Sequence, residues 1–158
     1  MTVFDDLGAE QDRLAGILSG LDEAQWRSTS GAAGWTIADV VLHLAQSEES
    51  VVATASGGAL RTGLGRADGG TVDEHVAALV AAERAAPDVV FERWQRARRA
   101  ALAALRAADP DRALAWVTAP VKPATLATTR LAEHWAHGLR SDWETGTVTR
   151  PDWDDEPR

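Results

Sequence analysis

Apolar residues recur every three to four positions along most of this 158-residue chain, and that spacing favours amphipathic helices over strands. The sequence is also rich in Ala, Leu, Arg and Glu, which favour helix, whereas it contains two Phe and no Tyr. No alternating pattern of useful length indicates a strand. Since the length suits one domain with one core, we expect a single all-α domain.

The residues that start and stop helices predict four long helices and one shorter one. Thr71 and Glu74 form a capping box for the short helix, which we expect to end near Ala86, before Pro87. Asp88 is expected to cap the third long helix. The long helices are expected at about residues 3–18, 36–55, 89–108 and 124–145, with loops at 22–34, 57–70 and 113–123.

The natural packing of these elements is a four-helix bundle with a short extra helix in the connection between helices 2 and 3. Gly146 suits the position after the last helix. We therefore expect residues 1–146 to form one helical bundle and residues 147–158 to form an acidic C-terminal tail.

Charge and composition argue against several classes of partner. The net charge is -8, whereas a nucleic-acid-binding protein normally presents a basic face. One basic cluster is mixed with Glu92 and is predicted to be a solvated helix face rather than a phosphate site; it comprises Arg93, Arg96, Arg98 and Arg99. The absence of Cys excludes thiolate metal sites and a Cys nucleophile.

The N-terminal residues lack the basic and apolar regions of a signal peptide, and no apolar run reaches membrane-spanning length. We therefore expect a cytoplasmic protein with no membrane or nucleic-acid partner.

The last predicted helix carries a pair of candidate metal ligands. Glu133 and His137 are four positions apart, so they lie on one helix face about one turn apart. His43, on the second long helix, is a suitable third ligand. Two imidazoles and one carboxylate suit zinc first, and nickel, iron(II) and cobalt also fit. Three protein ligands leave a position open for water or substrate, as in catalytic sites.

Spacing alone leaves other readings of these residues open. A Glu and a His four positions apart are common on solvated helices. His134 and His137, three positions apart, are an alternative pair that does not use Glu133. His43 alone fits an ordinary hydrogen-bonded residue at the border of an apolar stripe.

Two blocks of sequence carry a family resemblance. Residues 34–44, GWTIADVVLHL, are similar to the pattern G-W-[ST]-V-x(5)-H-L, and residues 127–138, ATTRLAEHWAHG, are similar to R-x-x-E-x-W-x-H-G. Together they resemble the DinB-like superfamily, specifically the metal-binding N-terminal domain of the actinobacterial mycothiol-dependent maleylpyruvate isomerase family. The resemblance implies a DinB-type bundle whose three metal ligands are His43, Glu133 and His137. It gives His134 no ligand position.

The resemblance implies a metal-dependent enzyme that acts on a small molecule, as a thiol-dependent transferase or isomerase, or by hydrolytic, lyase or cyclisation chemistry. The candidates for acid–base or supporting roles are His134, Asp39 and Arg140. The alternatives are a non-catalytic bundle that binds a metal or a small ligand, and a bundle without metal that binds an apolar ligand.

Two departures from the family pattern bear on these expectations. Arg140 stands at the position where family members often carry Asp, and its spacing predicts a salt bridge with Glu144 in preference to a substrate contact. The mycothiol-using enzymes carry a further C-terminal domain, which argues against mycothiol as a cofactor for a chain that ends after the bundle. Trp143 and Trp153 suit a homodimer interface.

Overall fold

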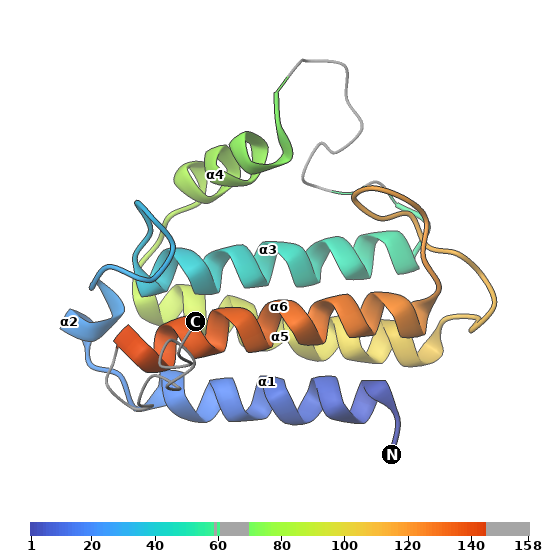
Figure 1. The fold of residues 1–158 in the computed structure, drawn as a ribbon, viewed down its shortest axis with the longest axis horizontal. Coiled ribbons are helices and arrows are strands. Elements are labelled where there is room, and N and C mark those ends of the chain that lie inside the picture. The colour runs from blue at the N-terminus through green and yellow to red at the C-terminus, as the bar shows by residue number, and fades with distance from the viewer. Residues whose placement is uncertain (59, 61–69, 145–158) are drawn as a thin grey trace, which may run out of the picture.

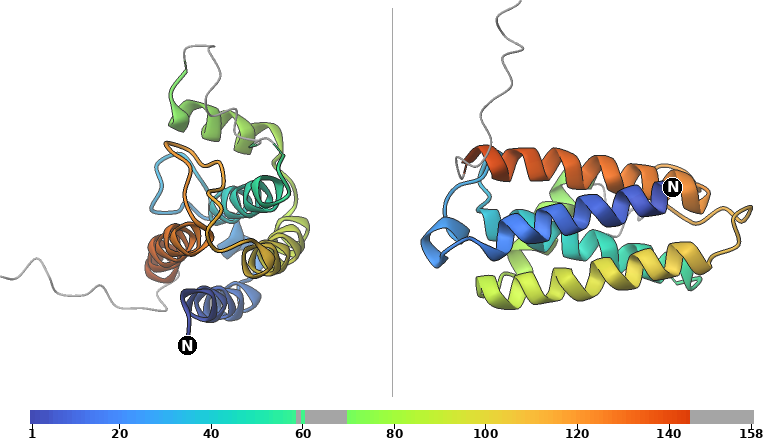
Figure 2. Two further views of the ribbon diagram at one scale, coloured as in Figure 1. Left: turned by 90° about the vertical axis from the view of Figure 1, so that its right-hand side faces the viewer. Right: turned by 90° about the horizontal axis from the view of Figure 1, so that it is seen from below.

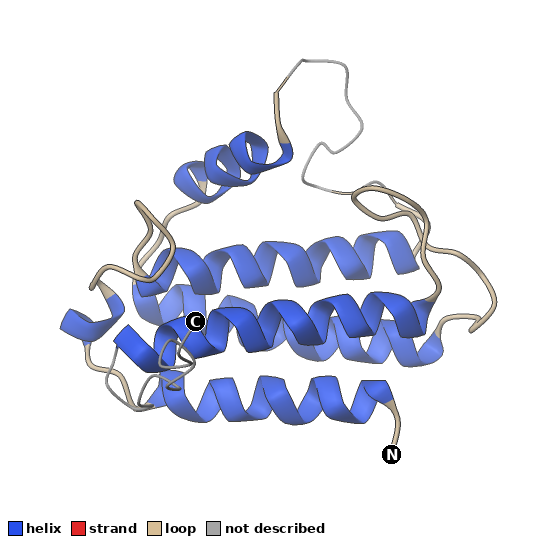
Figure 3. Cartoon of the chain, in the orientation of Figure 1, coloured by secondary structure: helices blue, strands red, loops and turns tan. Residues whose placement is uncertain are grey.

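The computed structural model describes residues 1–58, 60 and 70–144, and its regular structure within them is helical (Figure 3). The helices are α1 (Val3–Ser19), α2 (Glu23–Trp26), α3 (Ile37–Ala55), α4 (Val72–Ala82), α5 (Pro87–Ala107) and α6 (Pro123–Glu144). The four long helices lie side by side, and α4 lies apart from them, above α3 (Figure 1, Figure 2). This arrangement confirms the predicted four-helix bundle and the extra helix between its second and third long helices.

Local hydrogen bonds explain where α3 and α4 begin. The Thr36 hydroxyl accepts from the backbone N–H of Asp39 at 3.2 Å, and the Asp39 carboxylate accepts from the Thr36 N–H at 3.0 Å. Thr71 and Glu74 make the same reciprocal pair at the start of α4. A side-chain cap of this kind stabilises a helix by about 1 kcal/mol.

Three helix boundaries differ from the predicted ones. Helix α2 lies within the predicted 22–34 loop, where Asp22 and Gln25 form a capping box. Helix α4 ends at Ala82 rather than near Ala86. The predicted cap by Asp88 is wrong, because α5 already begins at Pro87, whose fixed φ and missing N–H suit the first helical position. Gly146 and the 147–158 tail lie outside the described residues.

The core consists of two clusters of buried side chains along the bundle. One includes Leu14, Val41 and Trp94, from α1, α3 and α5. The other includes Leu105 and Leu126, from α5 and α6. Burial of one such side chain stabilises the fold by about 1.5–3 kcal/mol. Within the described residues, no helix combines the length and apolar character that a membrane crossing requires.

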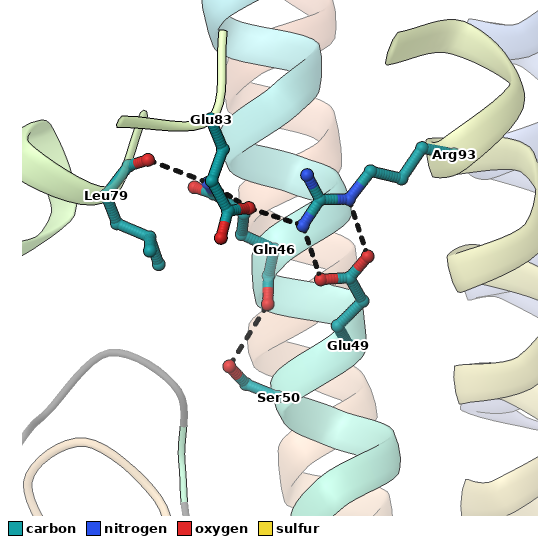
Figure 4. Close-up of polar contacts among 6 residues, drawn as sticks. All are labelled: Gln46, Glu49, Ser50, Leu79, Glu83 and Arg93. Carbon is teal, nitrogen blue, oxygen red and sulfur yellow. Dashed lines mark hydrogen bonds and ion pairs between the residues drawn. The ribbon is translucent and has the colours of Figure 1, made fainter. Parts of the chain in front are cut away.

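The C-terminal end of α4 is held to α3 and α5 by polar contacts (Figure 4). The Gln46 amide donates to the Leu79 carbonyl at 3.1 Å and to the Glu83 carboxylate at 3.2 Å. The Arg93 guanidinium donates to Glu49 at 2.7 and 2.8 Å and to Glu83 at 2.6 Å. These contacts hold α4 in its position above α3.

The predicted basic cluster is not uniformly solvated. Arg93 joins the contacts that hold α4, and Arg98 is buried, with its guanidinium 2.8 Å from Asp12 and 5.3 Å from the centre of the Trp94 ring. Arg96 is exposed and lies 3.8 Å from Glu92. The prediction of a solvated face therefore fails for Arg93 and Arg98, because tertiary contacts turn them toward carboxylates and an indole ring.

Candidate metal centre

His43, on α3, faces Glu133 and His137, on α6, across the bundle. Each side chain offers one ligand atom, and the three atoms lie within 4.8 Å of one another. Glu133 Oε2 is 3.2 Å from His137 Nε2, and the His43 and His137 ring centres are 5.5 Å apart in an edge-on arrangement. The structure thus brings together the three residues that the sequence singled out.

The spacing of these atoms can be compared with that of ligands around a metal ion. Nitrogen and oxygen ligands at 2.0–2.1 Å from a tetrahedral ion lie about 3.3 Å apart. The Glu133–His137 separation matches this value, and small side-chain movements would bring His43 to the same separation. Two imidazoles and one carboxylate are donors that zinc accepts, as do nickel, iron(II) and cobalt. The residues therefore fit one divalent ion.

The protonation states of His43 and Glu133 also suit a metal site. Burial, with added repulsion from His137 and Arg130, lowers the pKa of His43 to about 4, so this imidazole is neutral near pH 7. A hydrogen bond from His137 and the nearby charge of Arg130 lower the pKa of Glu133 to about 2. A neutral imidazole and an ionised carboxylate are the forms that bind metal ions.

The three candidate ligands line a cavity of about 740 Å³ between α3, α4, α6 and three loops. Its apolar lining includes Trp35, Val76 and Trp116. The Trp35 ring also packs beside His43, with ring centres 5.4 Å apart. The volume is typical of a site for a small molecule, so a ligand in the cavity has direct access to all three residues.

His134 lies behind this cavity, in the interior of the bundle. It is fully buried, its Nε2 accepts a 3.3 Å hydrogen bond from Trp94 Nε1, and its Nδ1 is 2.8 Å from the Arg130 carbonyl oxygen. Because an indole N–H only donates, the ring proton belongs on Nδ1. Burial lowers the pKa of His134, so the ring is neutral and both nitrogens take part in structural hydrogen bonds.

Asp39 lies outside the candidate site. The Asp39 carboxylate caps α3 and accepts from Arg84 at 2.9 and 3.1 Å, outside the cavity lining. Burial opposes ionisation of Asp39, but hydrogen bonds from Arg84 and Thr36 hold its pKa below the usual value. The side chains of Arg140 and Glu144, with their predicted salt bridge, and those of Trp143 and Trp153 lie outside the described part of the chain.

A buried ion pair beside the candidate ligands was not predicted. Arg130, on α6, donates from Nε to Glu48 Oε1, on α3, at 2.8 Å. The two residues are 3% and 0% exposed, and Arg130 also lines the cavity. The sequence signal was the position of Arg130 three residues before Glu133, within the second of the two family-like blocks.

Comparison with known proteins extends these observations. Residues 7–139 match the family model described as the mycothiol maleylpyruvate isomerase N-terminal domain. Two Mycobacterium tuberculosis proteins, uncharacterized proteins MT0041 and Rv0036c, are each 33% identical over 138 residues, which are 85% of this chain and 52% of theirs. The chain therefore spans about half the length of these curated relatives.

Two solved structures share the fold. Crystal structures of the mycothiol-dependent maleylpyruvate isomerase and of a mutant form align with TM-scores of 0.68, at 16% and 15% identity. Each alignment covers 87% of this chain and 58% of the other. At this identity, the likeness shows that these proteins share the fold of this chain.

Proposed function

The chain belongs to the mycothiol maleylpyruvate isomerase N-terminal domain family, and from this membership we propose that it binds one divalent metal ion through His43, Glu133 and His137. The observation that carries the proposal is the meeting of three ligand atoms, within 4.8 Å of one another, at the wall of a 740 Å³ cavity. Zinc is the first ion to test, followed by nickel, iron(II) and cobalt.

The proposed activity is metal-dependent chemistry on a small molecule, of the thiol-dependent transferase or isomerase class, with lyase or cyclase chemistry as the next class. A bound ion would supply polarisation of a carbonyl group or a lower pKa for a bound water or thiol. The chain itself supplies a confined site, in which Trp35 and Trp116 help to exclude bulk water. Mycothiol, on which the isomerase of the two solved structures depends, is the first thiol to test.

The placement of His134 and Asp39 favours a second candidate function, a bundle that binds a metal or a small ligand without catalysis. Both residues were among the three predicted acid–base candidates, and both make structural contacts away from the cavity lining. In this case the cavity and the metal site act in capture or transport of a ligand.

Metal content tests the proposal directly. Protein purified without a His tag and exposed to zinc is analysed for metal, alongside His43→Ala and the matched control His75→Ala. His75 lies on α4, where its Nδ1 is 2.7 Å from the Thr71 carbonyl oxygen. We expect close to one ion per chain in the wild type and in the control, and less than a tenth of that in His43→Ala.

Failure of the wild type to retain zinc, nickel, iron(II) or cobalt overturns the metal proposal. The two candidate functions are then separated by assay of the loaded protein with thiols and small carbonyl compounds. Turnover that disappears in His43→Ala supports the enzyme, whereas saturable binding without turnover supports the binding protein.

A further inference from the structure

We propose that Arg130 binds an anionic oxygen, of the carboxylate class, on the small molecule that occupies the cavity; this role rests on the proposed metal site in the same cavity. Arg130 lines the cavity but is only 3% exposed. Its Nε donates to Glu48, and its buried Nη2 has no acceptor within hydrogen-bond reach among the described residues. A buried donor without a partner costs about 1–3 kcal/mol, so a bound acceptor would relieve that cost.

The charges around the cavity favour an anion over a neutral ligand. Glu48 balances Arg130 within the buried pair, and Glu133 contributes one negative charge. A divalent ion held by Glu133 and the two neutral imidazoles would leave this end of the cavity with a formal charge of +1. Asp73 also lines the cavity, but it is exposed at the start of α4, where solvent screens its charge.

The donor geometry of Arg130 and the apolar lining of the cavity indicate which class of ligand fits. A guanidinium presents a planar set of donors that matches the two oxygens of a carboxylate. Trp35, Val76 and Trp116 supply apolar walls for the rest of the molecule. The fitting ligand is therefore a small carboxylate with an apolar or planar body, whose charged group lies next to Arg130.

Benzoate and benzamide test this inference, because they share a shape and differ in charge. Calorimetric titration of zinc-loaded protein gives the ratio of the two affinities. The test variant combines Arg130→Met with Glu48→Gln, which removes both charges of the buried pair together. The control variant combines Arg96→Met with Glu92→Gln, the exposed pair on α5 whose charged atoms are 3.8 Å apart.

The preference for benzoate should fall about tenfold in the test variant and stay unchanged in the control, because one charge-assisted hydrogen bond is lost. A preference that stays within threefold of the wild type, at wild-type zinc content, overturns the proposal. If the test variant does not fold, Arg130→Lys replaces it. This change keeps the charge beside Glu48 but removes the planar donor set. It should weaken the binding of benzoate and leave the binding of benzamide unchanged.

The same measurements separate this inference from the proposed metal site. Wild-type protein that takes up no zinc contradicts the metal site, and the benzoate preference is then measured on metal-free wild type and test variant. A preference that depends on Arg130 in that protein supports the anion site by itself. Equal ratios in the two metal-free proteins overturn it.

Discussion

The indole Nε1 of Trp94 donates a 3.3 Å hydrogen bond to Nε2 of His134, and this contact ties α5 to the helix that carries Glu133 and His137. Both rings are fully buried. Since the other nitrogen of His134 bonds to the Arg130 carbonyl, the ring is held at two points. The contact therefore fixes the rotation of α6 about its axis, and with it the direction in which Glu133 and His137 face.

Replacing Trp94 with Phe should destabilise the bundle by about 2–4 kcal/mol, because it removes buried volume and leaves His134 Nε2 without a donor. Urea unfolding followed by circular dichroism gives the change. Trp135→Phe is the matched control, since Trp135 is 51% exposed on α6 and should change stability by no more than about 0.5 kcal/mol. Equal losses in the two variants would contradict the role given to the Trp94–His134 contact.

Asp39→Ala should lower the free energy of unfolding by about 1–2 kcal/mol and leave metal content unchanged. The substitution removes the α3 cap at Thr36 and the acceptor for Arg84, but it removes no residue of the cavity lining. Asp73→Ala, an exposed carboxylate at the start of α4, serves as the control. Loss of bound zinc in a folded Asp39→Ala protein would show that Asp39 supports the metal site directly.

Metal removal should lower the thermal stability of the wild type by an amount that depends on the free metal concentration. An ion that binds only the folded state adds about 2.7 kcal/mol at a concentration one hundred times its Kd. Differential scanning calorimetry with zinc and with a chelator measures the shift in Tm. His43→Ala should show no shift, whereas His75→Ala should respond like the wild type.

The metal-free protein should lose stability as the pH falls from 6.5 to about 4. His43 has an ordinary pKa of 6.5 when unfolded and about 4 when folded, so below pH 6.5 the unfolded chain binds the proton and the folded chain does not. The shift of His43 lowers the free energy of unfolding by about 3 kcal/mol at pH 4 and leaves it unchanged above pH 7. The pKa of the buried His134 is also lowered, so it adds a loss in the same direction.

Urea unfolding of the metal-free protein at pH 7.5 and pH 4.5 measures this loss. His43→Gln should show a smaller difference between the two pH values than the wild type, and His75→Gln should match the wild type. An equal pH dependence in wild type and His43→Gln would contradict the lowered pKa of His43.

Local signals account for the parts of the fold that were predicted. The Thr36–Asp39 and Thr71–Glu74 pairs are three residues apart, so the starts of α3 and α4 are legible in the sequence. Asp22 and Gln25 carry the same signal for α2, but the Ser and Gly residues that follow favoured a loop. The early end of α4 was not predicted because it depends on contacts of Glu83 with distant residues of α3 and α5.

The candidate site was likewise predicted in part, from local signals and from the family-like blocks. Glu133 and His137 are paired by helical spacing, and the place of His43 on the second long helix makes it a plausible third ligand. The family-like blocks then made this trio the preferred one. The Arg130–Glu48 pair joins positions 82 residues apart, and no local pattern connects them. The metal assignment of the trio stays a prediction until its metal content is measured.

The separation of the candidate ligands along the chain has a consequence for biogenesis. His43, on α3, and Glu133, on α6, are 90 positions apart in the sequence. An ion held by both would close a long loop, and closing a long loop stabilises a fold more than closing a short one. If the trio binds the ion as proposed, the polypeptide would have to be synthesised through His137, and α6 would have to dock against α3, before the ion could load. Metal uptake would then report on completed assembly.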